Sequence, residues 1–441
     1  MAEPYIREQM SFSLLKIVGS ASLLLMISGF VGCSSESKPP FDLSQATYVG
    51  SSSCTQCHRN EMQQHAGSHH ALAMQVADEK TVLGDFADAH LEHLGISNRM
   101  FRDGKNFMVE TEGPDGELQA FRVSYVFGLT PLQQYMVEFP AEGNKTSDQT
   151  GHPELPRIQV LPLCWDTKNK KWFYLDPPDV KDKMDPHDDL HWTGIGQRWN
   201  NMCAECHSTN YQKNFQPAEF VSLASHRPET VNQADSKIGT YNSTFSEINV
   251  ACEACHGPAS VHVDLAKKSF PGWNRQRGYG LANLKLSAEN QIQSCAPCHA
   301  RRGLVFADFK AGDNYYDHYQ ENLLVWPIYY PDGQVLDEDY IHGSFLQSKM
   351  YHKGIRCTDC HDPHTAKLKH EGNQVCTSCH QHPTAKYDSP THHFHKVGSE
   401  GASCVNCHMP ATTYMEVDAR HDHSLRLPRP DMSLAMGTPN A

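Results

Sequence analysis

The sequence is short of positive charge, of apolar residues and of long apolar runs. It has 38 lysines and arginines against 51 aspartates and glutamates, and the formal net charge of −13 argues against a nucleic-acid-binding protein. Its apolar run at residues 17–31 is shorter than the roughly 20 residues that a membrane-spanning helix needs. Hydrophobic residues make up only 39% of the chain, so apolar side chains alone are too few to fill its interior.

Cysteine and histidine, by contrast, are abundant and patterned. The 16 cysteines and 28 histidines include seven copies of Cys-x-x-Cys-His, where random placement predicts roughly 0.04 copies. Cysteines at i and i+3 of a helical turn share a face and can each form a thioether to a haem vinyl group, and the following His becomes the proximal iron ligand. The sequence therefore predicts seven covalently attached haem c groups. The copies are Cys54, Cys57 and His58; Cys203, Cys206 and His207; Cys252, Cys255 and His256; Cys295, Cys298 and His299; Cys357, Cys360 and His361; Cys376, Cys379 and His380; and Cys404, Cys407 and His408. We number them one to seven.

Zinc ribbons and redox-active dithiols also use Cys-x-x-Cys pairs. Neither requires a His after every second Cys, so both explain the repeated five-residue unit poorly. A disulfide scaffold is typical of short chains without a core, whereas this chain is long enough to bury one or two cores.

The N-terminus is typical of an export signal. Residues 1–32 combine two basic residues with the apolar run, and Phe30-Val31-Gly32-Cys33 resembles a bacterial lipobox, in which cleavage before Cys33 is followed by lipidation. Ser34 resembles the outer-membrane sorting pattern. Residues 33–50 then form a flexible tether, and we expect an exported, periplasm-facing lipoprotein of the outer membrane of a Gram-negative bacterium. The alternative is a plain cleaved signal.

The remaining chain divides by motif density. We expect a first haem module over 51–75, with a helix carrying motif one, a small antiparallel β-rich insertion over 76–190, a central region with haems two to four over 191–310, a C-terminal region with the doubled motif and haems five to seven over 311–432, and a disordered tail over 433–441. Turn signals at 113–116 and around Asn169 predict two hairpins. Cys164 in the insertion is expected to be a buried, reduced strand cysteine. Because each haem is served by about 60 residues, the haems themselves form much of the core, with short helices and irregular loops packed around them.

Distal ligands come from the 21 histidines outside the motifs (28 − 7). A histidine beside a motif, or in a short loop that can reach a neighbouring ring, is the best candidate. The candidates are His70, His262, His352, His364, His395 and His423, followed by His191 and His318. The alternatives close to them in the sequence are His65, His69, His392 and His393. Iron with two imidazoles has no open site and carries electrons, whereas haem catalysis needs an exchangeable position. We expect Arg301 and Arg302 to pair with haem propionates.

Several segments carry a family resemblance. SHHALAM, WNNMCAECHSTN, ACEACHGPASVHV, FLQSKMYHKGIRCTDCHDPHT, CVNCHMPATTYM and DHSLRLPRPD resemble bacterial multihaem c-type cytochromes of the cytochrome c-552/4 (cytochrome c-554) type, over nearly all of residues 48–432. The resemblance implies an exported electron carrier, and it favours His70, His262 and His364 as distal ligands. The Cys-x-x-Cys-Lys haem of cytochrome c nitrite reductases is absent.

The favoured function is a lipid-tethered heptahaem electron-transfer protein. It would pass single electrons between a membrane or periplasmic donor, such as a quinol-linked complex, and a terminal acceptor. A multihaem oxidoreductase that reduces nitrite, hydroxylamine or sulfite at one open-site haem is the alternative, and a module of an extracellular cytochrome filament ranks last. The expected partners are redox proteins and, through the lipid anchor, the membrane.

Overall fold

The computed structural model describes residues 42–139, 157–177, 180–217, 239–268, 280–337, 340–380 and 386–439. The chain divides into two compact units, 1–42 and 43–441, and the second contains all seven motifs. The expected signal peptide and residues 33–41 of the expected tether lie outside the described residues. The end of the tether is held in place rather than flexible, because the Thr47 N–H donates to the Ser260 hydroxyl and the Gly50 N–H to the Glu253 carboxylate, both at 2.8 Å. Within the ranges above, no helix is long and apolar enough to cross a membrane.

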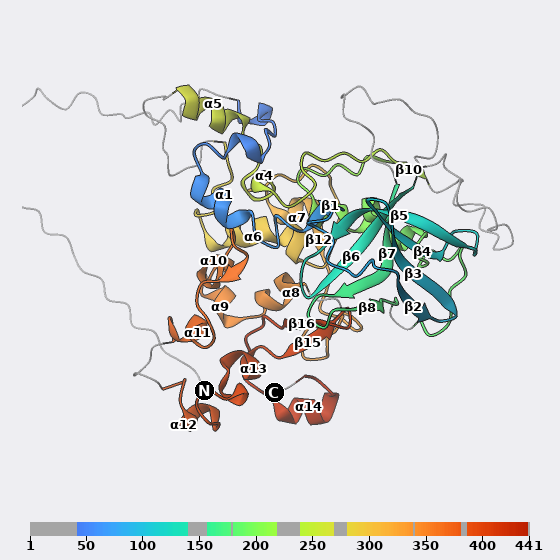
Figure 1. Ribbon diagram of the computed structural model, residues 1–441. Helices are drawn as coiled ribbons and strands as arrows, with labels where there is room; N and C mark the ends of the chain where they lie inside the picture. The colour runs from blue at the N-terminus through green and yellow to red at the C-terminus, as the bar shows by residue number, and fades with distance from the viewer. Residues whose placement is uncertain are drawn as a thin grey trace, which may run out of the picture. The chain divides into compact units, whose positions relative to one another are not determined.

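An eight-stranded antiparallel sheet follows motif one (Figure 1). Its order is β2-β3-β4-β5-β6-β7-β8, and β1 pairs with β5. The insertion is therefore much larger than the small one expected. Its turns at 113–117 and 167–170 join β4 to β5 and β7 to β8, which confirms both predicted hairpins. The strands are β1 (Met74–Val76), β2 (Ala89–His93), β3 (Ile96–Asp103), β4 (Asn106–Glu112), β5 (Leu118–Phe127), β6 (Leu132–Phe139), β7 (Arg157–Asp166) and β8 (Lys171–Tyr174).

One face of the sheet carries its own hydrophobic core. Alternate residues of the strands are buried there, among them Met100, Val109 and Leu163, as the two-residue period of a strand requires. Trp192, from the loop after the sheet, closes this core and donates from Nε1 to the Glu112 carbonyl oxygen at 2.7 Å. Cys164 is buried and reduced, as predicted, and burial raises the pKa of its thiol.

Replacement of Trp192 by alanine is expected to destabilise the sheet by about 3–5 kcal/mol, because a large buried ring is lost and a cavity remains. Trp192 is only 2% exposed and meets Phe121 edge-to-face, with ring centroids 5.0 Å apart. Denaturant unfolding followed by circular dichroism measures the change. Leu118→Ala is the control, because this β5 side chain is 52% exposed and its loss should change the free energy of unfolding by less than about 0.5 kcal/mol. Equal effects of the two substitutions would contradict the assignment of Trp192 to the core.

The motif-bearing regions contain the expected short helices, and they also contain two-stranded hairpins that the sequence did not predict (Figure 1). The longest described helix, α6, has 12 residues and is capped by the Ser287 hydroxyl, which accepts from the Asn290 N–H at 3.0 Å. The helices are α1 (Arg59–His65), α2 (Trp199–Met202), α3 (Ala204–His207), α4 (Cys252–His256), α5 (Ser260–Lys268), α6 (Ala288–His299), α7 (Tyr315–His318), α8 (Ile341–Leu346), α9 (Lys349–His352), α10 (Cys357–Cys360), α11 (Gln374–Thr377), α12 (Pro390–His393), α13 (Cys404–His408) and α14 (Pro430–Met436). The hairpins are β9 (Phe215–Pro217) with β10 (Gly239–Tyr241), β11 (Arg302–Leu304) with β12 (Tyr319–Glu321), β13 (His361–Asp362) with β14 (Lys367–Leu368), and β15 (Ala411–Tyr414) with β16 (Asp418–His421).

Two local expectations differ from the structure. Motif one lies in hydrogen-bonded turns rather than in a helix, and α1 begins only at Arg59, after the motif. At the other end, α14 extends over Pro430–Met436, so residues 433–436 of the expected disordered tail are helical. Pro430 at the first position suits this helix because that position needs no N–H donor.

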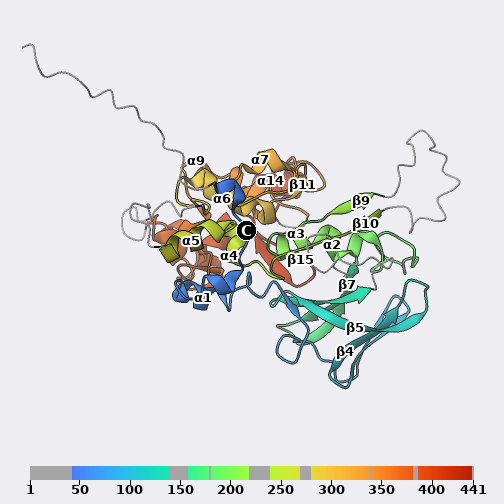
Figure 2. The same cartoon turned by 90° about the horizontal axis from the view of Figure 1, so that it is seen from above.

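The second face of the sheet positions motif two. Trp199 and Ala204 pack there against Met136, Ile158 and Val160 of β6 and β7, so these strands are buried on both faces. The Ile158 N–H donates to the Asn200 side-chain oxygen at 3.0 Å, which ties α2 to β7 (Figure 2). The sheet thus sets the place of the helices that lead into His207.

Candidate haem sites

Five of the seven motif histidines each face a second histidine ring from a distant part of the chain. The ring centroids of these pairs lie 6.2–6.4 Å apart. The pairs are His58 with His262, His299 with His70, His256 with His364, His361 with His423, and His408 with His392.

This separation fits one iron atom between two imidazoles. A metal–nitrogen distance of about 2.0 Å plus about 1.15 Å from nitrogen to ring centroid, on both sides, gives about 6.3 Å. Ordinary aromatic pairs also have centroids about 4.5–7 Å apart, so the assignment rests on this separation together with the Cys-x-x-Cys-His motif in each pair. The residues present therefore fit haem iron.

Four of the six distal candidates each face a motif histidine in the structure: His70, His262, His364 and His423. The other two do not: the His395 ring lies 6.5 Å from that of His393, and His352 is exposed and has no ring contact with a motif histidine within the described residues.

His392 takes the place that the sequence assigned to His395. It lies on α12, and its ring is nearly parallel to that of His408, with 7° between the planes. Phe394 ends this helix with a left-handed φ of 60°, so the chain changes direction before His395. The His-His-x-His pattern could have indicated a ligand here, but choosing among its members needs the helix end.

The two weaker candidates are engaged elsewhere. His318 contacts the Phe306 carbonyl oxygen from Nδ1 at 3.1 Å, with Nε2 3.8 Å from Asp313. His191 is buried, and its Nδ1 lies 2.8 Å from the Thr193 hydroxyl.

Motif histidines two and six differ from the other five. The His207 ring meets the edge of Phe127, at the end of β5, with centroids 4.2 Å apart. The His380 ring lies 6.4 Å from Tyr387. In the described part of the chain, no second imidazole faces either ring. His152, His226 and His382 lie outside that part.

Main-chain carbonyl groups orient several of the paired imidazoles. The His408 Nδ1 donates to the Arg426 carbonyl oxygen at 2.7 Å, and the His423 Nδ1 donates to that of His421 at 2.8 Å. The His70 Nδ1 lies 3.3 Å from the Pro363 carbonyl oxygen. A proton held on Nδ1 leaves the Nε2 lone pair for a metal, which is the usual arrangement around ligating histidines.

Burial also favours the ligand form of these rings. Burial, followed by the charge of neighbouring histidines, lowers the pKa of His207, His256 and His299 to about 4. Burial likewise lowers the pKa of His361 and His423. A histidine must be neutral to bind a metal, and a lowered pKa keeps it neutral at pH 7.

Neighbouring motifs meet at their cysteines. Thiols of neighbouring motifs lie close enough to shift one another's pKa, which places motif one beside three, four beside five, two beside four, and six beside seven. The pairs are Cys54 with Cys252, Cys295 with Cys357, Cys206 with Cys298, and Cys376 with Cys404. Since each cysteine would carry the edge of a haem, linked motifs would bring haem edges close together.

Motif three also contains a buried carboxylate, that of Glu253. Glu253 of motif three is 2% exposed and accepts the main-chain N–H groups of Val49 at 3.0 Å, Gly50 at 2.8 Å and Ala259 at 2.9 Å. It therefore joins the segment before motif one to α4. Glu253 carries no signal in the sequence, because an acidic residue at a variable motif position stands out only once its burial is known.

Arg301 and Arg302 each form an ion pair with a protein carboxylate. Arg301 lies 2.8 Å from Asp337, and Arg302 lies 3.0 Å from Glu205 of motif two. Arg302 Nε also donates to the Pro297 carbonyl oxygen at 2.8 Å. This arginine therefore ties motif two to motif four, and its expected pairing with a haem propionate stays a prediction.

A cavity of about 570 Å³ lies beside motif seven. Its lining includes Cys407, Lys349, Gln347, Arg426 and Met432. Cys407 would carry one thioether bond of haem seven, so this cavity belongs to the surroundings of that haem.

Comparison with known proteins agrees with this picture. Residues 350–385, which hold motifs five and six, match the family model of the doubled CXXCH motif. The fold is similar to that of the outer cell wall cytochrome OcwA, with a TM-score of 0.53 and 17% identity over 89% of this chain and 82% of that one. The octaheme sulfite reductase MccA of Wolinella succinogenes aligns with a TM-score of 0.36 and 18% identity, over 83% of this chain and 54% of that one. The search of curated proteins gave no match.

Two independent observations bear on identity: a doubled CXXCH sequence match and a fold shared with a cytochrome of known structure. The seven motifs and the spacing of the paired imidazoles agree with both. Together they support haem c binding and a multihaem c-type cytochrome.

Proposed function

We propose that the protein is an exported heptahaem cytochrome that transfers single electrons between a membrane or periplasmic donor and a terminal acceptor. The observation that carries this proposal is the set of five facing imidazole pairs at 6.2–6.4 Å. Haem iron supplies one-electron redox chemistry when bound, and two histidine ligands leave it no position for a substrate. Proximal His58, His256, His299, His361 and His408 would thus have His262, His364, His70, His423 and His392 as their distal ligands.

The contacts between motifs support a continuous electron path. Motif four contacts both motif two and motif five through cysteines, and motif three contacts motif one in the same way. The imidazole pairing of His256 with His364, three residues after His361, brings motif three next to motif five. These contacts place motifs one, three, five, four and two in a linear series, and electrons would enter at one end of it.

Export, the lipid anchor on Cys33 and attachment to the outer membrane are part of the same proposal, as are the domain boundaries and the cytochrome c-552/4 type. They rest on the signal-like N-terminus and on the quoted segments. The name of OcwA, an outer cell wall cytochrome, agrees with an exported location. Donor and acceptor would be redox proteins, and the high negative charge favours basic partner surfaces.

A reductase that acts on nitrite, hydroxylamine or sulfite is the second candidate. It is favoured by motif two, where His207 meets Phe127 and no second imidazole within the described residues. An iron without a distal protein ligand can bind a small oxyanion.

One experiment separates the two functions. Mass spectrometry of the mature protein is expected to show seven haem additions, and electron paramagnetic resonance of the oxidised protein is expected to show low-spin haem signals that do not respond to nitrite, hydroxylamine or sulfite. Fewer than five low-spin haems would contradict the proposed ligand pairs. A high-spin haem whose signal shifts with one of the three ligands would make that ligand the substrate to assay and the protein a reductase.

A further inference from the structure

The loop over residues 421–426 serves two haem sites at once. Its His423 ring faces His361 of motif five at 6.3 Å. Its Arg426 carbonyl oxygen accepts the Nδ1 proton of His408, the proximal histidine of motif seven, at 2.7 Å. The Arg426 main-chain N–H donates to the His408 carbonyl oxygen at 3.1 Å. The position of this one loop therefore decides the geometry at both irons of the proposed function, on which this inference rests.

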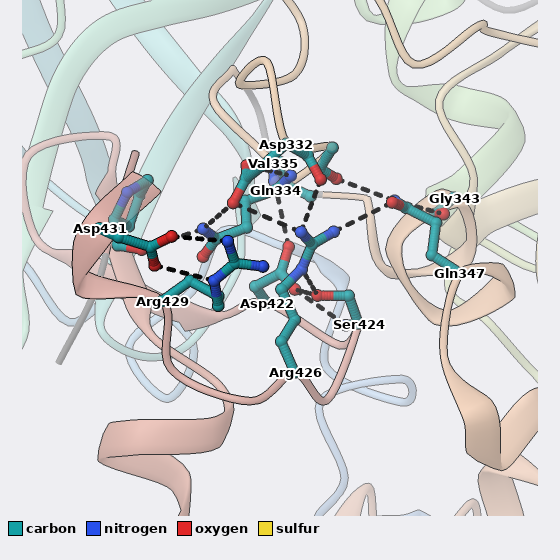
Figure 3. Close-up of polar contacts among 12 residues, drawn as sticks. Asp332, Gln334, Val335, Gly343, Gln347, Asp422, Ser424, Arg426, Arg429 and Asp431 are labelled. Atoms are coloured by element: carbon teal, nitrogen blue, oxygen red, sulfur yellow. Dashed lines mark hydrogen bonds and ion pairs between the residues drawn. The ribbon is translucent and has the colours of Figure 1, made fainter. Parts of the chain in front are cut away.

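The Arg426 guanidinium is held on all three nitrogens by protein acceptors (Figure 3). Nε donates to the Ser424 hydroxyl at 2.6 Å and Nη2 to the Gln347 side-chain oxygen at 3.0 Å. Nη1 donates to the Asp332 carbonyl oxygen at 2.5 Å and lies 3.3 Å from its carboxylate, which is only 5% exposed. The rigid fork of arginine can satisfy these separate acceptors together, which a lysine ammonium cannot do.

A second set of contacts anchors the same loop. The Asp422 carboxylate accepts the Val335 N–H at 3.1 Å and the Ser424 N–H at 2.8 Å. The His423 N–H donates to the Ser344 hydroxyl at 3.1 Å. Both sets of contacts reach residues 332–335 and 344–347, so these two segments fix the loop in place (Figure 3).

Arg426 borders the cavity beside Cys407, but its donors point to Asp332, Gln347 and Ser424. Its effect on the haems therefore passes through the loop. We infer that Arg426 is a positioning residue that couples haems five and seven: by fixing residues 421–426, it sets the distal imidazole of one and the proximal imidazole of the other.

The test compares Arg426→Gln with Arg429→Gln. Arg429 lies three residues on and also forms an ion pair, 2.6 Å from Asp431, but both side chains are at least 60% exposed. Each substitution removes one positive charge, and only the first releases the loop. Mutation of an outer-shell partner of a metal ligand typically costs about 10- to 100-fold in metal affinity or activity.

In Arg426→Gln, we expect the low-spin resonances of haems five and seven to shift or give way to high-spin signal, with the other resonances and the haem count unchanged. Arg426→Lys should recover the wild-type spectrum only in part, and Arg429→Gln should leave it intact. If Arg426→Gln fails to fold, Asp332→Asn removes the charged partner while keeping its size, and the same two haems should respond.

Two results would overturn the inference: an unchanged spectrum in both Arg426→Gln and Asp332→Asn, or the same change in Arg429→Gln. The proposed function is tested on the unmodified protein, where it predicts low-spin haems. Its failure there would be distinct from failure of the inference about Arg426. Haems five and seven are assigned in the spectra with His423→Ala and His392→Ala.

Discussion

Replacement of His392 by alanine is expected to convert the haem at Cys404 and Cys407 from low spin to high spin. The His392 ring lies 6.2 Å from that of His408, at the separation of two imidazoles on one iron. Removal of the distal ligand leaves the iron five-coordinate, and five-coordinate haem with one imidazole is typically high-spin and open to small ligands. Electron paramagnetic resonance should show one new high-spin haem, and added imidazole should restore the low-spin signal.

His395→Ala is the matched control, because His395 lies three residues away in the same histidine cluster and faces His393 instead. It should leave all the low-spin signals in place. The opposite result would be a high-spin signal in His395→Ala and an unchanged spectrum in His392→Ala. It would show that the end of α12 lies differently over the iron and that His395 is the distal ligand, as its position in the sequence suggested.

Replacement of Glu253 by glutamine is expected to raise the reduction potential of the haem of motif three. A negative charge stabilises ferric over ferrous iron, so its removal favours reduction. Two unit charges about 10 Å apart at an effective dielectric of about 20 interact by roughly 1.7 kcal/mol, which corresponds to a shift of about 70 mV upward. The haem of motif one should shift in the same direction, because His58 and His256 lie close together.

A spectroelectrochemical titration measures both shifts. Glu61→Gln provides the control: this carboxylate lies 4.0 Å from His58 but is 49% exposed, so water and salt screen its charge. Its removal should move the potentials by much less. A downward shift in Glu253→Gln, or an equal shift in the two variants, would mean that burial of Glu253 does not govern these potentials.

Glu253→Gln should also loosen the segment before motif one. An amide has one acceptor oxygen where the carboxylate has two, and three main-chain N–H groups converge there. A buried donor left without a partner costs about 1–3 kcal/mol. Hydrogen exchange at residues 47–51 reports this loosening separately from the change in potential.

The sequence by itself determined the chemistry of the protein. Both thioether cysteines and the proximal histidine of each predicted haem lie within five residues, so local spacing is enough to identify them. The hairpin turns at 113–116 and around Asn169 could be read for the same reason, since turn residues act over a few positions. Proximity to a motif also pointed to His262 and His364, whose rings each face a motif histidine; their role as distal ligands stays a prediction.

Only the tertiary structure decided which residues meet across the chain. The pairing of His70 with His299, the choice of His392 over His395, and the engagement of Arg302 by Glu205 depend on how distant segments pack. The size of the sheet was decided in the same way, because β1 and β2 are short and gain their stability from pairing with β5 and β3 rather than from their own sequence. A covalent cofactor motif is local chemistry, whereas a second ligand, a buried charge or an edge strand is defined by its neighbours in space.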